Sequence, residues 1–257
     1  MNIRTDYKFK AKELLDKVIN MKASKSITLI LPAYNEAARI ENTVKEAVSH
    51  FENQHLDYEI IVSADGDDGT RELVARMSQN NSLIRVIGSE ERRGKGYSIR
   101  QAVAIARGDF IGFTDADDKT PITQLDGFLS LLENGTDIVI GSRALYNSII
   151  ERPQPLYRRL GSHGFGFFMH LVVGLWDIPD TQCGFKFFRS EVAKYLFARQ
   201  KIDGYMFDVE ILYLARCEGY RIQQVPVRWR DDGDSRLDLV MGNIRNIQDI
   251  FKIRFTR

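Results

Sequence analysis

The first 140 residues alternate between short apolar runs and longer segments in which apolar positions recur every three or four residues. The apolar runs predict strands that are buried on both faces, and the periodic segments predict amphipathic helices. The predicted strands span residues 27–31, 58–63, 83–87, 110–114 and 138–140. The predicted helices span residues 37–51 and 94–106, a segment around Leu73, Val74 and Met77, and a segment that Pro121 opens. This alternation predicts an α/β fold with one mostly parallel sheet and helices on both of its faces.

The pattern is less regular in the second half of the chain. An apolar run at 165–176 and a helical segment at 207–217 are followed by a strand at 220–229, and Pro226 indicates that this strand lies at a sheet edge. The chain ends in a predicted helix that places on one face Val240, Ile244, Ile247 and Phe251. No apolar run reaches the roughly 20 residues that a membrane-spanning helix needs. The first residues also lack the apolar core of a signal peptide.

Polar and acidic residues follow three of the predicted strands, at 32–36, 64–70 and 115–118. Ligands of parallel sheets bind at the carboxyl ends of the strands, so these segments predict a binding site. Asp115 and Asp117 lie two residues apart, and in an extended chain both carboxylates would point to the same side. Such hard oxygens suit Mg²⁺ or Mn²⁺, which then bridges phosphate oxygens. A solvated acidic loop or a helix cap explains the pair equally well.

The second acidic turn contains Asp65, Asp67 and Asp68 together with two glycines. Glycine permits close approach of the backbone, and Asp68 is placed to cap the next helix, so turn chemistry alone is an alternative explanation. Two acidic turns after neighbouring strands nevertheless favour a site for a divalent metal and a phosphate ester.

Lys95 lies in a basic segment at 92–96 that precedes a predicted helix. Helix N-termini and basic side chains both attract anions, which makes this segment a candidate phosphate contact. An exposed basic turn is the alternative. The glycine patterns of a P-loop and of a dinucleotide-binding turn are missing, which argues against NAD chemistry.

The 36 Lys and Arg residues nearly balance the 35 Asp and Glu residues, for a net charge of +1, which argues against a nucleic-acid-binding protein. Two cysteines cannot build a disulfide framework, and a reducing, cytosolic compartment is the simplest expectation. The charge is unevenly spread, because residues 1–25 and 239–257 are basic. We expect these ends to form basic amphipathic helices around a main domain at 26–238. Such helices bind anionic membrane surfaces, although packing on the core is an equal alternative.

The chain resembles the inverting GT-A glycosyltransferases of family 2, through LPAYNE at 31–36, ADGDDGT at 64–70, RGKG at 93–96, DADD at 115–118 and GSR at 141–143. Within that family it is most similar to the branch of dolichyl-phosphate glucosyltransferases and mannose synthases. The motifs that indicate this branch are DTQCGFKFFR at 180–189, FDVEILYLA at 207–215 and VPVRW…GDSR at 225–236. The resemblance covers residues 25–238 and implies the GT-A fold, whose single mostly parallel sheet is Rossmann-like.

The resemblance also implies roles for individual residues. Contacts with the nucleotide sugar are implied for Pro32, Ala33, Tyr34, Glu36, Asp65, Asp67, Lys95, Asp115, Ala116, Asp117, Arg143 and Gln182. Metal binding is implied for Asp115 and Asp117, and binding of an acceptor phosphate for Arg143, Arg158, Arg159 and Arg236. The implied catalytic residues are Asp117, Asp208 and Arg236. Arg236 stands where the family usually has lysine, and its planar guanidinium changes the contact geometry.

The implied activity is transfer of a hexose, glucose before mannose, from UDP-glucose or GDP-mannose to a polyprenyl (dolichyl-type) phosphate, with Mg²⁺ or Mn²⁺. The metal and Arg236 would neutralise the leaving group, and an anionic acceptor needs no strong base. Three alternatives stay open. The first is a family 2 transferase that acts on a glycan hydroxyl and needs Asp208 as a base. The others are a nucleotidyltransferase and a non-enzymatic protein that binds nucleotide sugars.

We expect a peripheral protein on the cytoplasmic face of a membrane, where a lipid acceptor would be found. Whether an integral-membrane protein acts as a partner stays open.

Overall fold

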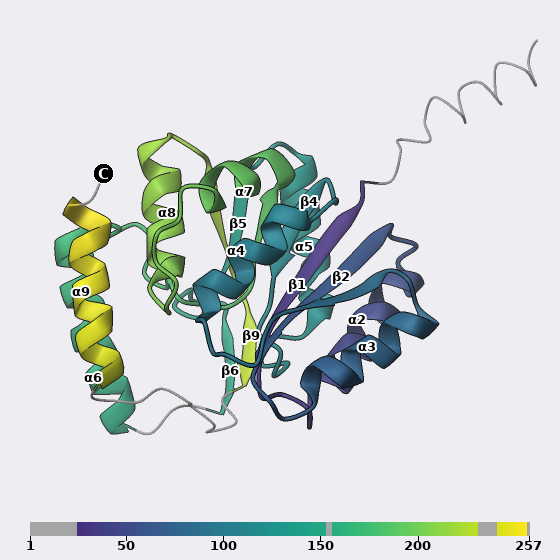
Figure 1. Cartoon of the computed structure of the whole chain (residues 1–257). Coiled ribbons are helices and arrows are strands. Elements are labelled where there is room, and N and C mark those ends of the chain that lie inside the picture. The colour runs from purple at the N-terminus through teal and green to yellow at the C-terminus, as the bar shows by residue number, and fades with distance from the viewer. Residues whose placement is uncertain (1–24, 153–155, 231–240, 256–257) are drawn as a thin grey trace, which may run out of the picture.

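The computed structural model describes residues 25–152, 156–230 and 241–255 (Figure 1). In chain order the elements are β1 (Ile27–Tyr34), α2 (Ile40–Asn53), β2 (Tyr58–Asp65), α3 (Thr70–Asn80), β3 (Ile84–Ile87), α4 (Lys95–Ile105), β4 (Phe110–Phe113), the 3₁₀ helix η1 (Ile122–Gln124), α5 (Leu125–Glu133), β5 (Ile138–Ser142), β6 (Ile149–Arg152), α6 (Leu156–Val173), β7 (Lys186–Arg189), α7 (Ser190–Phe197), α8 (Phe207–Cys217), β8 (Ile222–Pro226), β9 (Arg228–Arg230) and α9 (Met241–Phe255).

Seven strands form one sheet in the order β3-β2-β1-β4-β7-β5-β8, which confirms the predicted α/β fold with a mostly parallel sheet. The exception is β7, which is antiparallel to both of its neighbours, β4 and β5. The carboxyl ends of β1, β2, β4 and β5 therefore meet at one edge, and β7 begins at that same edge. β6 and β9 pair in a separate two-stranded sheet.

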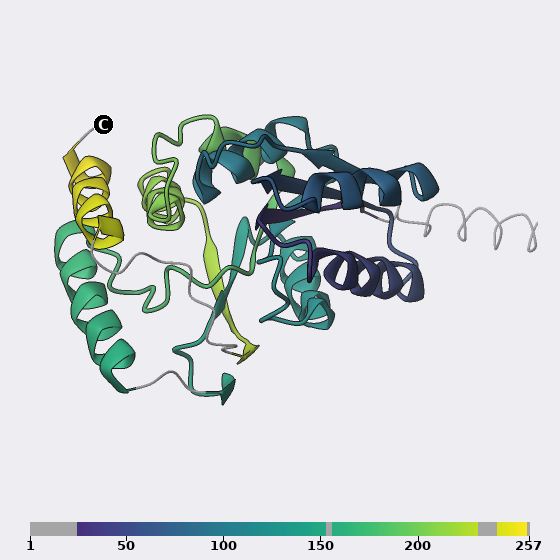
Figure 2. The same ribbon diagram turned by 60° about the horizontal axis from the view of Figure 1, so that its bottom comes forward.

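Helices cover both faces of the sheet (Figures 1 and 2). Ile30 and Ile61 belong to a core with residues of α4, α7 and α8. Leu29 and Ile60, one residue earlier in the same strands, belong to the opposite core with residues of α2, α3 and α5. Because successive side chains of a strand alternate in direction, two buried faces require strands that are apolar throughout. The continuous apolar runs in the sequence have this cause.

Several elements differ from the sequence-based prediction. The single strand predicted at 220–229 is wrong, because the chain leaves the large sheet after Pro226 and continues in β9 of the small one. β8 does lie at the sheet edge, as Pro226 indicates. Pro121 precedes the η1 turn rather than opening α5 directly. The strands β6 and β7 and the helix α7 were not predicted at all.

The C-terminal helix α9 lies beside α6 at one end of the molecule (Figures 1 and 2). Ile250 and Ile253 of α9 are buried against the core, whereas Val240 lies outside the described residues. Residues 1–24, in which the first basic helix is predicted, also lie outside them. Among the described helices, none has the length and apolar character to cross a bilayer.

Candidate active site

The three polar segments that follow β1, β2 and β4 meet at the carboxyl edge of the sheet. β1 and β2 pair in register to their last residues, where Tyr34 lies opposite Asp65. β4 ends at Phe113, two residues before Asp115. Phe113 pairs with Lys186, the first residue of the antiparallel β7. The fold thus brings four segments that are distant in sequence to one edge.

Asp115 is held from two sides at this edge. Its Oδ1 lies 2.5 Å from Nζ of Lys95, the first residue of α4. On the other side, a Cβ atom added at Gly184 would lie only 2.2 Å from Oδ2 of Asp115. The backbone at Gly184 therefore packs directly against the carboxylate, and a larger residue there would displace Asp115.

The surrounding charges keep this pair ionised. Burial favours the neutral form of Asp115, but Lys95, together with Lys119 and Lys186, outweighs burial and holds the pKa of Asp115 below its ordinary value. Burial also opposes the charge of Lys95, yet the carboxylates of Asp115 and Asp208 raise the pKa of Lys95. At neutral pH the site therefore presents a carboxylate with an ammonium group beside it.

Asp117 carries a buried oxygen that could accept a further partner. Its Oδ2 lies 2.7 Å from Nζ of Lys119. Its Oδ1 is buried and accepts no hydrogen bond from the described residues. The sequence-based expectation of an extended chain from Asp115 to Asp117 is wrong. β4 ends at Phe113, and residues 116–117 form a turn. Between the two aspartates, the buried Ala116 accepts a hydrogen bond of 2.8 Å at its carbonyl from Oγ1 of Thr43.

Asp115 and Asp117 offer carboxylate oxygens of the kind that bind a divalent cation. Buried oxygens without a partner are rare in proteins, and Oδ1 of Asp117 is one. No group of three or more His, Cys, Asp or Glu side chains with metal-site geometry exists among the described residues. Mg²⁺ is commonly held by only one or two carboxylates, with phosphate and water oxygens completing its shell. The two carboxylates therefore fit a divalent metal whose remaining ligands come from water or a bound ligand.

The second acidic turn is mainly a structural element. Asp65 is buried, and its carboxylate accepts hydrogen bonds from the backbone N–H groups of Ser89 (3.4 Å) and Arg93 (3.0 Å). It thereby fixes the segment that leads into α4 and Lys95. Asp67, two residues after the end of β2, is exposed to solvent.

Asp68 links the loops that follow β1 and β2. Its Oδ1 accepts a hydrogen bond of 3.1 Å from the N–H of Thr70, and its Oδ2 accepts one of 2.9 Å from the N–H of Ala37. The N-cap of α3 is Gly69, so Asp68 supports the helix start without being the cap residue. Burial opposes ionisation, but these hydrogen bonds lower the pKa of Asp68.

The end of β1 offers an aromatic surface. The guanidinium of Arg92 lies over the ring of Tyr34, 4.4 Å from its centroid. Arg92 also donates a hydrogen bond of 3.3 Å to the hydroxyl of Tyr205. Pro32 and the buried Ala33 are part of β1 itself, and Glu36 lies in the turn that follows it. Among the residues implied for nucleotide binding, Tyr34 therefore presents its ring at the same edge as Asp65.

Arg143 is clamped by Asp180. Nε and a terminal nitrogen of Arg143 each donate a 2.8 Å hydrogen bond to the carboxylate, and the backbone N–H of Arg143 donates a third. This two-pronged geometry orients the guanidinium, which also lies over the Trp229 ring, 5.2 Å from its centroid. Gln182, two residues after Asp180, is exposed.

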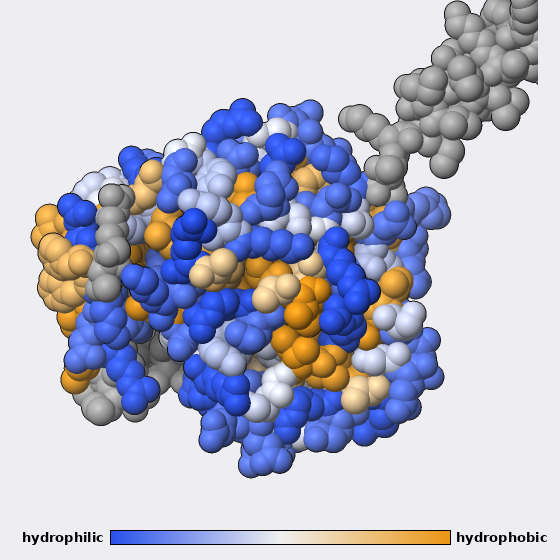
Figure 3. Space-filling view, turned by 45° about the horizontal axis from the view of Figure 1, so that its top comes forward, coloured by the Kyte–Doolittle hydropathy of each residue, from blue (hydrophilic) through white to orange (hydrophobic). Residues whose placement is uncertain are grey.

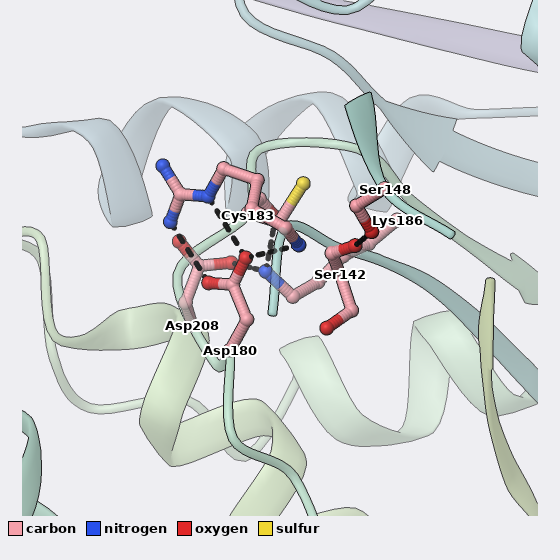
Figure 4. Close-up of polar contacts among 7 residues, drawn as sticks. Ser142, Ser148, Asp180, Cys183, Lys186 and Asp208 are labelled. Carbon is pink, nitrogen blue, oxygen red and sulfur yellow. Dashed lines mark hydrogen bonds and ion pairs between the residues drawn. The ribbon is translucent and has the colours of Figure 1, made fainter. Parts of the chain in front are cut away.

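Asp208 is not an accessible carboxylate. It lies in the first turn of α8, is 3% exposed, and forms a 2.7 Å salt bridge with Lys186, which is fully buried (Figure 4). Burial raises the pKa of Asp208, and Lys186 and Lys95 oppose that rise. The carboxylate of Asp208 is therefore buried beneath the carboxyl edge of the sheet and is not exposed to solvent.

Sequence reasoning missed Asp180, Gly184 and Lys186. All three lie in the DTQCGFKFFR segment, which supported the resemblance but received only one residue assignment, Gln182. A signal existed, because a lone lysine between phenylalanines in an apolar run needs a buried partner. Finding that partner required the fold.

Three of the implied phosphate-binding residues cannot be placed. The side chains of Arg158 and Arg159, in the first turn of α6, lie outside the described residues, and so does Arg236. Their roles stay predictions.

Comparisons with known proteins find relatives over most of this chain. A family model described as glycosyl transferase family 2 matches residues 28–197. A dolichyl-phosphate beta-glucosyltransferase of Trichomonas vaginalis is 34% identical over 239 residues, which cover 88% of this chain and 70% of that protein. One from Dictyostelium discoideum is 33% identical over 89% of this chain and 74% of its own length.

A solved structure has a similar fold. The glucosyl-3-phosphoglycerate synthase of Mycobacterium tuberculosis, in complex with Mn²⁺, UDP and phosphoglyceric acid, superposes with a TM-score of 0.68. The superposition covers 91% of this chain and 79% of that one at 23% identity, which supports the fold alone.

Proposed function

Because this chain belongs to glycosyl transferase family 2, we propose that it transfers glucose from UDP-glucose to a polyprenyl phosphate of the dolichyl type, with inversion at the anomeric carbon. The observation that carries the proposal is the pair Asp115 and Asp117 at the carboxyl edge of the sheet, each beside a lysine. The acceptor and the sugar are supported by the dolichyl-phosphate beta-glucosyltransferases that resemble this chain over most of its length.

The donor would bind across the edge. Tyr34 offers a ring for stacking with the base, and Asp65 and Asp67 lie on the neighbouring strand end. Asp115 and Asp117 would hold Mg²⁺ or Mn²⁺, which when bound offsets the charge that develops on the diphosphate. Lys95 lies beside Asp115 and would contribute a further positive charge to the leaving group.

The acceptor would bring its own negative charge. A phosphate monoester with a second pKa near 6 is largely dianionic at neutral pH. One of its oxygens can therefore attack the anomeric carbon, while the bond from that carbon to UDP breaks on the opposite face. Asp208 is buried in a salt bridge with Lys186, which agrees with a reaction that needs no general base. We propose that Arg143, Arg158, Arg159 and Arg236 bind the acceptor phosphate.

The test is a panel of UDP- and GDP-sugars with polyprenyl phosphate and Mn²⁺, in which the released nucleoside diphosphate and the lipid product are measured. We expect UDP-glucose to be the best donor and EDTA to stop the reaction. Asp117→Asn should lower kcat by about 100-fold or more, because it removes one charged group of the transition-state site. Glu72→Gln, an exposed carboxylate of α3, is the matched control and should keep full activity.

The alternatives give different products. Glucose transfer to a glycan without lipid would favour the hydroxyl acceptor, and release of pyrophosphate would favour a nucleotidyltransferase. Nucleotide binding without turnover of any donor would favour a binding protein. Each of these results would contradict the proposal.

We further propose that the end of the molecule formed by α6 and α9 contacts an anionic membrane surface. Large apolar side chains are exposed there, on and just after α6 at Phe167, Leu171 and Trp176, and on α9 at Ile244, Ile247, Phe251 and Phe255. Figure 3 displays hydrophobic surface at this end, beside hydrophilic surface. The exposed cations of α9 are Arg245, Lys252 and Arg254. Apolar side chains with adjacent cations suit the cytoplasmic leaflet, which carries anionic lipids.

Co-sedimentation with vesicles of phosphatidylcholine and phosphatidylserine tests this surface. Deleting α9 would expose the core at Ile250, so point substitutions are preferable. We expect the double variant Leu171→Ser with Phe255→Ser to lose most of the vesicle binding. These side chains are 63% and 74% exposed, so replacing them should change the free energy of unfolding little. Tyr146→Ser, at an exposed aromatic residue in the loop after β5, is the control. Wild-type protein that stays in the supernatant at low salt would refute the membrane contact.

A further inference from the structure

Lys186 is a fully buried cation in a strand of aromatic residues. It is 0% exposed, and its neighbours in sequence are Phe185 and Phe187. A buried ammonium group is costly unless it is paired and hydrogen-bonded. Its Nζ donates to Oδ1 of Asp208 at 2.7 Å and to the carbonyl of Cys183 at 2.5 Å (Figure 4). Replacing a buried ion pair with packed apolar residues is often neutral for stability, so this pair can serve a purpose other than folding.

The bond to Cys183 closes a turn that reaches the active site. The turn runs from Cys183 to Lys186, and Gly184 within it packs against the carboxylate of Asp115. At the other end of the turn, Lys186 pairs in the sheet with Phe113, two residues before Asp115. Any shift of the Lys186 side chain therefore reaches Asp115 through both the turn and the strand.

The partner carboxylate connects the same turn to α8. Asp208 lies in the first turn of α8, and its negative charge also acts on Lys95, the ion-pair partner of Asp115. Lys186 compensates Asp208, so that Lys95 stays directed to Asp115. The two ion pairs, Lys95–Asp115 in front and Lys186–Asp208 behind, form one electrostatic unit.

We propose that Lys186 is a positioning residue for the transfer reaction, which holds the 183–186 turn against Asp115 and occupies Asp208 as a counter-ion. Asp208 then acts through Lys186 and takes no proton from the acceptor. This inference rests on the proposed function, because it assigns Asp115 to the nucleotide and its metal.

The experiment separates positioning from folding with a paired replacement. Lys186→Met alone leaves Asp208 buried without its counter-ion and should unfold much of the protein. The double variant Lys186→Met with Asp208→Leu removes both charges and should recover a melting temperature near that of the wild type. Lys194→Met, an exposed lysine of α7, is the matched control.

The main readout is binding of UDP in the presence of Mn²⁺, measured by calorimetry without an acceptor. We expect the folded double variant to bind UDP with Mn²⁺ about 10–100-fold more weakly, as is typical when a supporting residue of a ligand site is lost. Transfer activity should fall through the KM for UDP-glucose as well as through kcat.

Three results would overturn the inference. Wild-type-like binding and activity in the double variant would show that the pair only supports the fold. Unchanged UDP binding with a loss of kcat alone would show that Asp208 is a general base. Failure of the wild type to bind any nucleotide with Mn²⁺ would overturn the proposed function and this inference with it. The first result leaves the proposed function intact, whereas the second favours the alternative acceptor, a glycan hydroxyl.

Discussion

Asp118 has an unusual backbone and an unusual neighbour. Its φ of 53° lies in the left-handed region, which asparagine and aspartate adopt more readily than other non-glycine residues. Partial burial, followed by the nearby carboxylate of Glu46, raises the pKa of Asp118 from 3.8 to about 7. Two carboxyl groups in contact cannot both ionise easily, so one shares a proton with the other.

The raised pKa predicts how stability depends on pH. The folded state holds a proton on Asp118 that the unfolded chain releases near pH 4, so this contribution is full below about pH 4 and is lost as the pH rises through about 7. Asp118→Asn keeps the left-handed preference and cannot ionise. We expect the variant to be more stable than wild type at pH 8 and to show a flatter free energy of unfolding from pH 4 to 8. Urea unfolding in EDTA measures this, and parallel curves for the two proteins would contradict it.

At the scale of the elements, the antiparallel strand β7 is the feature that builds the site. It inserts between β4 and β5 and requires very close packing, because a Cβ atom at Gly112 of β4 would lie 1.8 Å from the ring of Phe187 of β7. The glycine makes room for an aromatic ring from the next strand. The position of Lys186 at the edge depends on that contact.

Gly112→Ala should therefore destabilise the protein by about 1–3 kcal/mol, the usual cost of overpacking a core. Gly127→Ala in α5 is the control, since a Cβ atom there meets no atom within 4 Å. It should stabilise the helix by about 0.5–1 kcal/mol. Thermal unfolding of both variants measures the two changes in stability. Equal changes would show that the contact between Gly112 and Phe187 does not limit the size of residue 112.

At the scale of the whole molecule, both cores meet at the sheet, and the candidate site lies along one edge of it. A ligand that bridges the ends of β1, β2 and β4 contacts elements from both cores. Its binding should therefore stabilise the fold as a unit.

UDP with Mn²⁺ at a hundred times its dissociation constant should add about 2.7 kcal/mol to the free energy of unfolding. For a chain of this size the melting temperature should rise by about 5–10 °C. Differential scanning fluorimetry measures the shift, with UDP alone and Mn²⁺ alone as controls. Asp117→Asn should lose the part of the shift that requires Mn²⁺, and an equal shift in that variant would place the metal elsewhere.

The framework of the sheet can be predicted from the hydrophobic pattern of the chain. The runs at 27–31, 58–63 and 110–114 became β1, β2 and β4 because a strand buried on both faces must be apolar at every position. The carboxyl ends of these strands also indicated Asp115 and Asp117 as candidate site residues, since parallel strands end at one edge. These features follow from local composition and from a rule of topology, so no tertiary contact was needed to predict them.

The assembly of the site depends on contacts between residues that are distant in sequence, which the hydrophobic pattern does not reveal. The antiparallel direction of β7 is one such feature. The salt bridge between Lys186 and Asp208 joins residues 22 positions apart, and the ion pair between Arg143 and Asp180 joins residues 37 positions apart. Hydrophobic periodicity reports whether a position is buried, but it carries no information on which distant charge lies opposite. The strand predicted at 220–229 failed for the same reason, because Pro226 marks a sheet edge while the next pairing partner, β6, lies far away in the chain.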